Sequence, residues 1–225
     1  MVCRAFKVKL DRLIKDIRKN KIFGRVITVV YTIEFQKRGL PHAHIVLFFH
    51  HDDKYPTKED INHILSVEIP NKENDPVYYE AVGKHIMHGP CGDLKKDSPC
   101  MESGKCIRHF PKRFFDSTTV DEDGYPIYRR REDGRTINKS GIDIDNQYVM
   151  PHNRKLLLKY RAHVNVEWCN QLRSIEYLFK YMNKGHDRVT ASFYKSAATD
   201  AEEDDCDEVS MYYDCRYISP CEVAW

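Results

Sequence analysis

Residues 25–50 read RVITVVYTIEFQKRGLPHAHIVLFFH, two apolar runs separated by a short polar segment. The two ends of this stretch, 25–35 and 44–50, are rich in β-branched and aromatic residues, which favour strands. The polar segment 36–41 between them contains a glycine and a proline, as turns often do. The stretch therefore predicts an antiparallel β-hairpin.

Two histidines, His42 and His44, begin the second half of this hairpin, and residues two apart on a strand project from the same face. Glu34 and Gln36, also two apart, end the first half, which the hairpin brings alongside. Two imidazoles and one oxygen ligand leave coordination positions open, which suits Mg²⁺ or Mn²⁺ holding a phosphate. The alternative is ordinary surface or hydrogen-bonded histidines, because this spacing alone is weak evidence.

The charge of the chain is unevenly distributed. Its 225 residues include 36 Lys and Arg against 34 Asp and Glu, but residues 199–208 hold seven acids and no Lys or Arg. We therefore expect a disordered acidic loop at 199–208 and a body with a net charge of +9. Such a body favours a phosphate-bearing partner, with a merely solvated surface as the alternative.

The cellular setting follows from what the sequence lacks. It opens without the apolar region of a signal peptide, and nowhere do about 18 apolar residues follow one another. We expect a soluble, intracellular protein with no transmembrane segment and no membrane partner. In a reducing compartment its eight cysteines are free thiols or metal ligands rather than disulfides.

Several further elements are predicted from periodicity and capping. Residues 5–19 place apolar side chains on one helical stripe, with Lys and Arg on the other side. Thr57 is a suitable N-cap for a short helix, and Pro76 can begin another. Residues 160–169 alternate polar and apolar side chains, which predicts a strand.

Residues 174–184, SIEYLFKYMNK, are predicted to form a helix with two tyrosines four positions apart on one face. Tyrosines at this spacing are ordinarily core residues. The functional alternative is a nucleophilic phenol, activated by a metal or a nearby lysine, that attacks phosphorus. The residues concerned are Tyr177, Tyr181, Lys180 and Lys184.

Residues 88–140 change in texture to Cys, Gly, Pro and charge, and we expect an inserted, loop-rich subdomain there. Four of its residues have the spacing H-x2-C-x8-C-x5-C, which supplies enough ligands for one structural Zn²⁺. The spacing is irregular, so free thiols remain the alternative. These residues are His88, Cys91, Cys100 and Cys106.

Several strings resemble one known family. They are YTIEFQKRGLPHAHIVLFF, YLFKYMNKG, RYISPCEVAW, HGPCG, SPCM with GKC, FPKRF, DGYPIYRRR and HVNVEWCNQ. Together they resemble the Helitron transposase, specifically its Rep-like (HUH) endonuclease domain, also called the Helitron helicase-like domain. The similarity extends over nearly the whole chain.

The resemblance implies an α+β fold of the HUH endonuclease type, a ferredoxin-like antiparallel sheet with packed helices whose central strand bears the two histidines. His42 and His44 then match the family's metal-binding histidines. Glu34 is the first choice for the third ligand and Gln36 the second. Tyr177 and Tyr181 match the two nucleophiles. His163 and Glu167 either border the site or lie on an exposed sheet face.

The implied activity is cleavage and joining of single-stranded DNA in rolling-circle transposition, through a 5′-phosphotyrosine. In this mechanism Lys180 or Lys184 offsets charge on the reacting phosphate. The run Arg129, Arg130 and Arg131 contacts the DNA backbone, or is simply a solvated charge run. The partner is single-stranded DNA and the compartment is nuclear or intracellular.

The resemblance also has limits. Residues 1–198 correspond to the endonuclease domain, with its insertion at about 88–140, and 199–225 to the acidic loop and a shortened C-terminal segment. A strand that family members carry before the first helix is missing, so we expect a fragment whose helicase lies on a separate or longer polypeptide. No Walker motif occurs, which argues against ATP hydrolysis. An inactive, transposon-derived fragment that at most binds nucleic acid is the alternative function.

Overall fold

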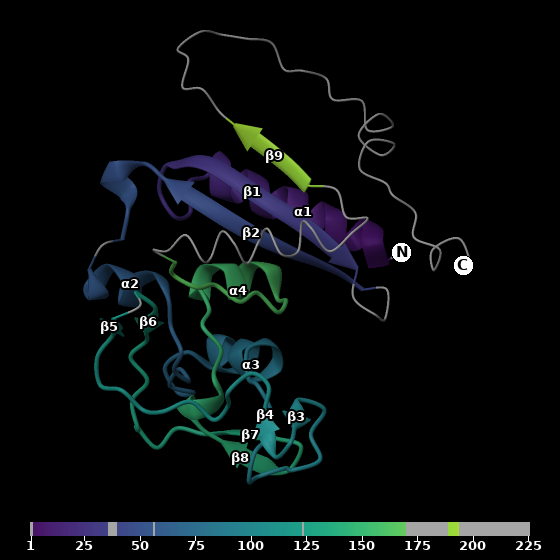
Figure 1. The fold of residues 1–225 in the computed structure, drawn as a ribbon, viewed down its shortest axis with the longest axis vertical. Helices are drawn as coiled ribbons and strands as arrows, with labels where there is room; N and C mark the ends of the chain where they lie inside the picture. The colour runs from purple at the N-terminus through teal and green to yellow at the C-terminus, as the bar shows by residue number, and fades with distance from the viewer. Residues whose placement is uncertain (1, 36–39, 56, 123, 170–188, 194–225) are drawn as a thin grey trace, which may run out of the picture. The chain divides into compact units, whose positions relative to one another are not determined.

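The computed structural model describes residues 2–35, 40–55, 57–122, 124–169 and 189–193 (Figure 1). The chain divides into two compact units. The first unit combines Met1–Lys54 with Gln171–Trp225, and the second is Tyr55–Asn170.

The described part of the first unit is an antiparallel sheet with one long helix. The sheet has the strand order β2-β1-β9, and α1 packs against one of its faces (Figure 1). Leu10 and Ile17 are buried on the inner side of α1, as the apolar stripe predicts. The bounds are α1 Val2–Arg18, β1 Val26–Phe35, β2 Pro41–Phe49 and β9 Val189–Phe193.

The predicted hairpin is confirmed. β1 pairs antiparallel with β2 from Val26 opposite Phe49 to Phe35 opposite Pro41, with one irregularity between Val26 and Thr28. β2 begins at Pro41, so both histidines lie within the strand. One expectation is wrong for the described residues: β1 is the central strand and the histidine strand β2 is at the edge. The α+β class is confirmed, with small antiparallel sheets and four α-helices among these residues.

The second unit contains three short helices with clear N-caps. Thr57 and Asp60 form a reciprocal capping box at the start of α2, as the sequence predicts. Asp75 caps the next helix, in which Pro76 takes the first position. Asn153 caps the third through the backbone N–H of Leu156. The bounds are α2 Lys58–Ile64, α3 Pro76–His85 and α4 Arg154–Tyr160.

The rest of the second unit consists of loops and very short hairpins, which confirms the loop-rich texture predicted for residues 88–140. Its core gathers side chains from α3, α4 and these loops, including Val82, Ile86 and Leu157, and two of the cysteines are buried in it. The hairpins are β3 Met101–Glu102 with β4 Lys105–Cys106, β5 Thr119–Val120 with β6 Pro126–Ile127, and β7 Ile137–Lys139 with β8 Ile142–Ile144. Two 3-10 helices, η1 His51–Asp53 in the first unit and η2 Asn146–Tyr148 in the second, complete the described elements.

The predicted strand at 160–169 is wrong. Helix α4 runs through Tyr160, and Arg161 ends it in the left-handed conformation, at φ +43°, with its N–H bonded to Leu157 O. Beyond it the chain through residue 169 has no strand partner among the described residues and is held by single contacts, such as the 2.9 Å bond from Trp168 Nε1 to Tyr55 O. Alternation of polar and apolar residues forms a strand only where a neighbouring edge supplies hydrogen bonds.

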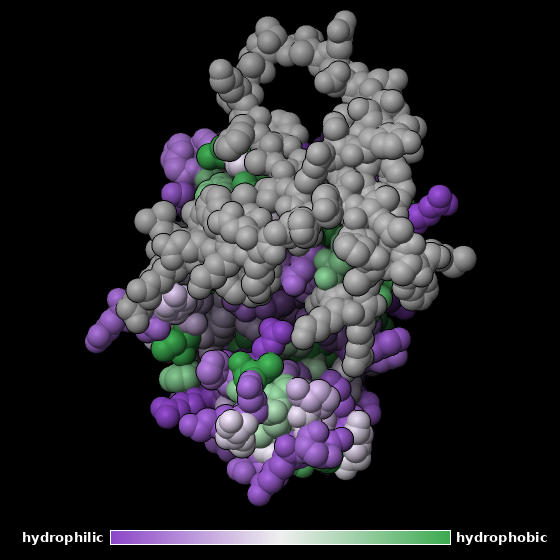
Figure 2. All heavy atoms as spheres, turned by 45° about the vertical axis from the view of Figure 1, so that its right-hand side comes forward, coloured by the Kyte–Doolittle hydropathy of each residue, from purple (hydrophilic) through white to green (hydrophobic). Residues whose placement is uncertain are grey.

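Hydrophilic side chains cover much of the described surface visible in Figure 2, with smaller apolar patches between them. None of the helices in the described ranges has the length and apolar composition that crossing a membrane requires.

Candidate metal centres

The first candidate centre lies on the β1–β2 hairpin. Glu34 and His42 are direct cross-strand partners, and His44 lies two residues further along the same face. His44 Nε2 is 3.3 Å from Glu34 Oε2, and the His42 and His44 rings are 4.7 Å apart between centroids. The side chains of His44 and Glu34 are 19% and 32% exposed, so the three residues form a half-buried polar patch.

The spacing of these ligands fits one hard cation. Two neighbouring ligands of an octahedral ion, each about 2.1 Å from it, stand about 3.0 Å apart at a right angle. The 3.3 Å between His44 Nε2 and Glu34 Oε2 is close to that separation. The patch is not one of the groups of three or more ligand atoms that, among the described residues, all lie within 4.8 Å of one another. Binding an ion therefore requires an adjustment of the His42 ring.

Thr32 adds a feature that the sequence reasoning missed. It is the cross-strand partner of His44 and is 2% exposed, and its hydroxyl has no hydrogen-bond partner among the residues that the structure describes. A buried hydroxyl without a partner is costly, so a ligand or water beside the histidines would satisfy it. Counting the hairpin register outward from the turn places Thr32 opposite His44, so the sequence did contain a signal for this residue.

The remaining predicted residues of this centre lie outside the described residues. They are Gln36, Tyr177, Lys180, Tyr181 and Lys184. Their roles stay predictions.

The second candidate centre lies in the second unit. His88, Cys91, Cys100 and Cys106 each offer one ligand atom, and these four atoms all lie within 4.8 Å of one another. Cys91 is fully buried and Cys106 is 5% exposed. His88 Nε2 and Cys106 Sγ are 3.3 Å apart. The structure thus brings together four ligands that are spread over 19 residues of sequence, in an arrangement able to hold a metal ion.

The loops that carry these ligands are fixed by the surrounding core. The backbone N–H of His88 donates to Tyr148 O at 2.8 Å, and the Tyr148 hydroxyl donates to Cys91 O at 3.1 Å. The His88 ring stacks on Phe110, with centroids 4.2 Å apart. Gly89 has a φ of +78°, and a Cβ there would come within 2.9 Å of Cys91 N. The turn from His88 to Cys91 therefore requires glycine.

The surroundings shift the pKa values of the four candidate ligands in different directions. Burial, aided by the nearby cations Lys139 and Arg108, lowers the pKa of His88 to about 4, so its imidazole is neutral, as a metal ligand must be. Burial raises the pKa of the Cys91 and Cys100 thiols. Burial also acts to raise the pKa of Cys106, but hydrogen bonds from backbone N–H groups and from the other two thiols together lower it. A metal ion would displace the thiol protons.

A third group, His50, His51 and Asp52, also brings its ligand atoms within 4.8 Å. His51 and Asp52 are exposed, and Asp52 accepts a 2.9 Å ion-pair contact from Arg25. This carboxylate is therefore already neutralised by a cation, and the group is a weaker candidate than the other two.

The arginine run at 129–131 has structural partners. Arg130 is 5% exposed and donates to the backbone carbonyls of Val67, Asn146 and Val149. Arg131 forms an ion pair with Glu68, with 2.6 Å between Nη2 and Oε2. Arg130 is therefore buried away from the surface, and Arg131, although 48% exposed, is held by a carboxylate.

His163 and Glu167 lie on the irregular segment after α4 and not on a strand. His163 Nδ1 donates to His85 O at 2.8 Å, and Glu167 accepts from Asn165 at 2.7 Å. Both are exposed within the second unit.

A search of curated proteins found no match to this chain. The segment that matches a known family contains α1, β1 and all of β2 except its last two residues, and so includes Glu34, His42 and His44. The chain is thus similar, over residues 1–47, to the family described as the Helitron helicase-like domain at the N-terminus.

Proposed function

We propose that this chain is a metal-dependent single-strand DNA endonuclease and strand transferase of a rolling-circle Helitron transposon, with a ferredoxin-like HUH fold. The observation that carries the proposal is the grouping of Glu34, His42 and His44 on one face of the hairpin. This grouping lies inside the segment that matches the Helitron helicase-like family.

Glu34, His42 and His44 would hold Mg²⁺ or Mn²⁺, with Gln36 as the alternative oxygen ligand. Once bound, the metal would supply positive charge that polarises the scissile phosphate. Two imidazoles and one carboxylate leave room on the ion for phosphate oxygens. The buried Thr32 hydroxyl beside His44 supplies a hydrogen-bonding group at the base of this patch.

The cleavage step uses Tyr177 or Tyr181. The phenol oxygen forms a bond to phosphorus while the bond from phosphorus to the 3′ oxygen breaks, and the phenol proton ends on that 3′ oxygen. The products are a 5′-phosphotyrosine and a free 3′-hydroxyl. Lys180 or Lys184 offsets the negative charge of the reacting phosphate, and the second tyrosine allows a further cleavage before the first bond is resolved.

The test is the covalent adduct itself. Purified chain is incubated with labelled single-stranded DNA and Mn²⁺, and the adduct is resolved on a denaturing gel. We expect an adduct that is lost in the Tyr177→Phe/Tyr181→Phe double variant and in His44→Ala. Glu34→Ala and Gln36→Ala, compared over a Mn²⁺ titration, identify the third ligand as the one whose loss raises the Mn²⁺ requirement by about 10-fold to 100-fold.

A folded, soluble chain that forms no adduct, or whose adduct persists in the double tyrosine variant, contradicts the endonuclease. The alternative, an inactive, transposon-derived protein that at most binds nucleic acid, then takes its place. Single-stranded DNA is the proposed partner of the endonuclease, and a helicase would be supplied by a separate or longer polypeptide.

We further propose that the second centre holds structural zinc. Tetrahedral Zn²⁺ with bonds of about 2.3 Å to sulfur and about 2.0 Å to nitrogen places its ligands about 3.5 Å apart. The 3.3 Å between His88 Nε2 and Cys106 Sγ and the 4.8 Å limit for all four ligands fit that geometry after a small contraction. Three thiols and a neutral imidazole, largely buried, match a closed structural site better than a catalytic one.

A further inference from the structure

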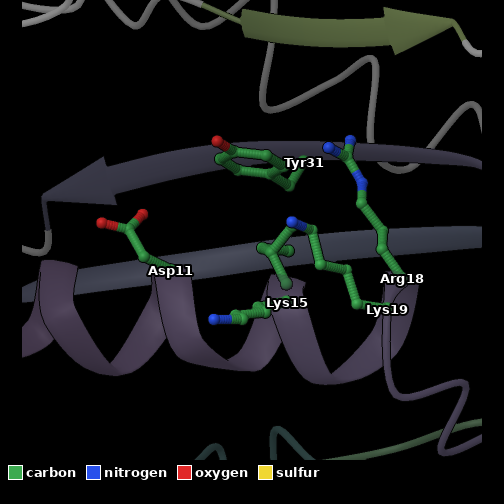
Figure 3. A pocket seen from close by; sticks show the side chains of 6 residues that line it. Asp11, Lys15, Arg18, Lys19 and Tyr31 are labelled. Carbon is green, nitrogen blue, oxygen red and sulfur yellow. The ribbon is translucent and has the colours of Figure 1, made fainter. Parts of the chain in front are cut away.

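A depression of about 430 Å³ lies in the first unit between α1 and β1. Helix α1 supplies most of its lining, and β1 adds one aromatic ring (Figure 3). The lining residues among those described are Asp11, Ile14, Lys15, Arg18, Lys19 and Tyr31.

The charge of this depression is positive. Lys15 and Lys19 are exposed, one helical turn apart, and neither has an ion-pair partner among the described residues. The acid of the lining, Asp11, is bound by Lys7 at 3.1 Å. Arg18 adds a third cation, and Figure 3 shows Arg18 and Lys19 extending from α1 in the direction of the Tyr31 ring.

The rest of α1 does not neutralise this charge. Residues 2–21 contain eight Lys or Arg and two Asp. The second of these, Asp16, is buried and accepts a 2.7 Å bond from Asn20. A surplus of cations therefore surrounds a concave surface that contains an aromatic ring.

The depression is separate from the histidine patch. Tyr31 and Glu34 are three residues apart on β1, and side chains an odd number apart on a strand project from opposite faces. The ladder is regular between Thr28 and Phe35, so this alternation is not interrupted. The depression thus occupies the α1 face of the sheet, and Glu34, His42 and His44 occupy the other.

We propose that this depression binds the phosphate backbone of single-stranded DNA at nucleotides away from the bond that is cut, with Tyr31 as a surface on which a base stacks. The inference rests on the proposed function for the identity of the ligand. Lys15 and Lys19 contact successive phosphates, and Arg18 adds a third cation to the same lining. Cations that follow a backbone beside an aromatic side chain are how proteins hold single strands without reading sequence.

The competing explanation is that Lys15 and Arg18 only complement the negative C-terminal end of the α1 dipole. That role predicts a change in stability and none in DNA binding. Affinity and stability must therefore be measured on the same variants.

The experiment measures fluorescence anisotropy of the whole chain with a labelled oligothymidylate of about 16 nucleotides, without added Mg²⁺ or Mn²⁺. The test variant is Lys15→Glu/Lys19→Glu. The matched control is Arg4→Glu/Arg12→Glu, which makes the same charge change on the same helix outside the lining. Circular dichroism confirms that both variants fold.

We expect the test variant to lose about tenfold or more in affinity, and the slope of log affinity against log salt to fall by about 1.4. The control should lose less than threefold in affinity, because its charges act on the DNA only at long range, where salt screens them. Duplex DNA of the same length should compete poorly. Equal losses in the two variants, no loss in either, or equal competition by duplex DNA would overturn the proposal.

A second measurement separates this proposal from the endonuclease. If the endonuclease is correct, His44→Ala abolishes the covalent adduct and keeps the affinity for the oligonucleotide. Lys15→Glu/Lys19→Glu then raises the DNA concentration needed for half-maximal adduct and keeps the yield at saturation. If no variant forms an adduct but the affinity loss is confined to the test variant, the endonuclease fails and the binding site stands.

Discussion

At the scale of single residues, burial shifts the pKa of His152 in a way that the sequence alone does not reveal. It is 0% exposed, and Tyr78 Oη lies 2.6 Å from its Nε2 while its Nδ1 is 3.0 Å from Met150 O. A neutral ring that donates from Nδ1 and accepts at Nε2 satisfies both contacts. Burial lowers the pKa of His152 to about 4.

The lowered pKa predicts a pH dependence of stability. The unfolded chain binds a proton on His152 below about pH 6.5, whereas the folded chain resists it down to about pH 4. The free energy of unfolding should therefore fall by about 2–3 kcal/mol between pH 7 and pH 4.5 on account of this group. Urea titrations of wild type and His152→Gln at both pH values measure it.

The His152→Gln variant should be less stable at pH 7 and should lose less stability on acidification. Tyr78→Phe is the control, because it removes the hydroxyl beside Nε2 and leaves the imidazole in place. It should cost about 1 kcal/mol and keep much of the pH dependence. An identical pH dependence in wild type and His152→Gln contradicts the assignment.

Residue types predicted which candidate ligands lie close together better than they predicted which residues have a structural role. Two patterns in the sequence indicate metal ligands: histidines two apart beside a carboxylate, and a group of thiols with one histidine. The structure places the described members of each set close together. Arg130 was indistinguishable from its neighbours in a run of three arginines, yet it is the one inserted among backbone carbonyls. Which member of a charge run turns inward depends on the register of a loop, and no local signal encodes that register.

At the scale of elements, prediction succeeded where a segment supplies its own partner. The hairpin carries both strands and their turn, and the capping residues act within their own helices. The segment 160–169 has a strand-like alternation, but Arg161 ends α4 there and no strand of the described residues lies alongside it. The local sequence pattern therefore predicts the hairpin and the helix caps, whereas tertiary contacts decide whether a segment such as 160–169 forms a strand.

The turn between His88 and Cys91 gives a prediction with a matched control. Gly89 and Gly104 both have a φ of +78°, but a Cβ would meet Cys91 N at 2.9 Å at Gly89 and nothing within 4 Å at Gly104. Gly104→Ala should cost about 1 kcal/mol of unfolding free energy from backbone strain alone. Gly89→Ala should cost at least about 1 kcal/mol more and weaken metal binding.

Thermal unfolding together with metal content per chain measures both variants. Equal losses in Gly89→Ala and Gly104→Ala would show that the close approach at the metal centre has no energetic consequence.

At the scale of the whole molecule, the second unit has a small core whose side chains come largely from loops, and three of the four proposed zinc ligands, Cys91, Cys100 and Cys106, belong to this core or pack against it. Cys91 and Cys106 pack in the same cluster as Val82, Ile86 and Leu157. A loop-rich unit with three hairpins of two or three residues per strand has few backbone ladders to hold it. Metal ligation would supply the missing cross-links.

Zinc should therefore determine the stability of the second unit. The fluorescence of Trp168 reports on this unit, because its indole N–H donates to Tyr55 O. The Trp225→Phe substitution leaves Trp168 as the sole tryptophan. In that background we expect one zinc ion per chain, and replacement by Co²⁺ should give the thiolate charge-transfer and tetrahedral absorption bands. A strong zinc chelator should lower the Trp168 unfolding midpoint by about 10 °C or more.

The variants distinguish ligation from a general effect of losing a thiol. Cys100→Ser should lose zinc and unfold early, whereas Cys3→Ser, an exposed cysteine of α1, should behave as wild type. His42→Ala should keep its zinc, since His42 belongs to the other centre. If Cys100→Ser retains zinc with unchanged cobalt spectra, the four residues are not its ligands, and the thiols of the second unit are buried core residues stabilised by packing alone.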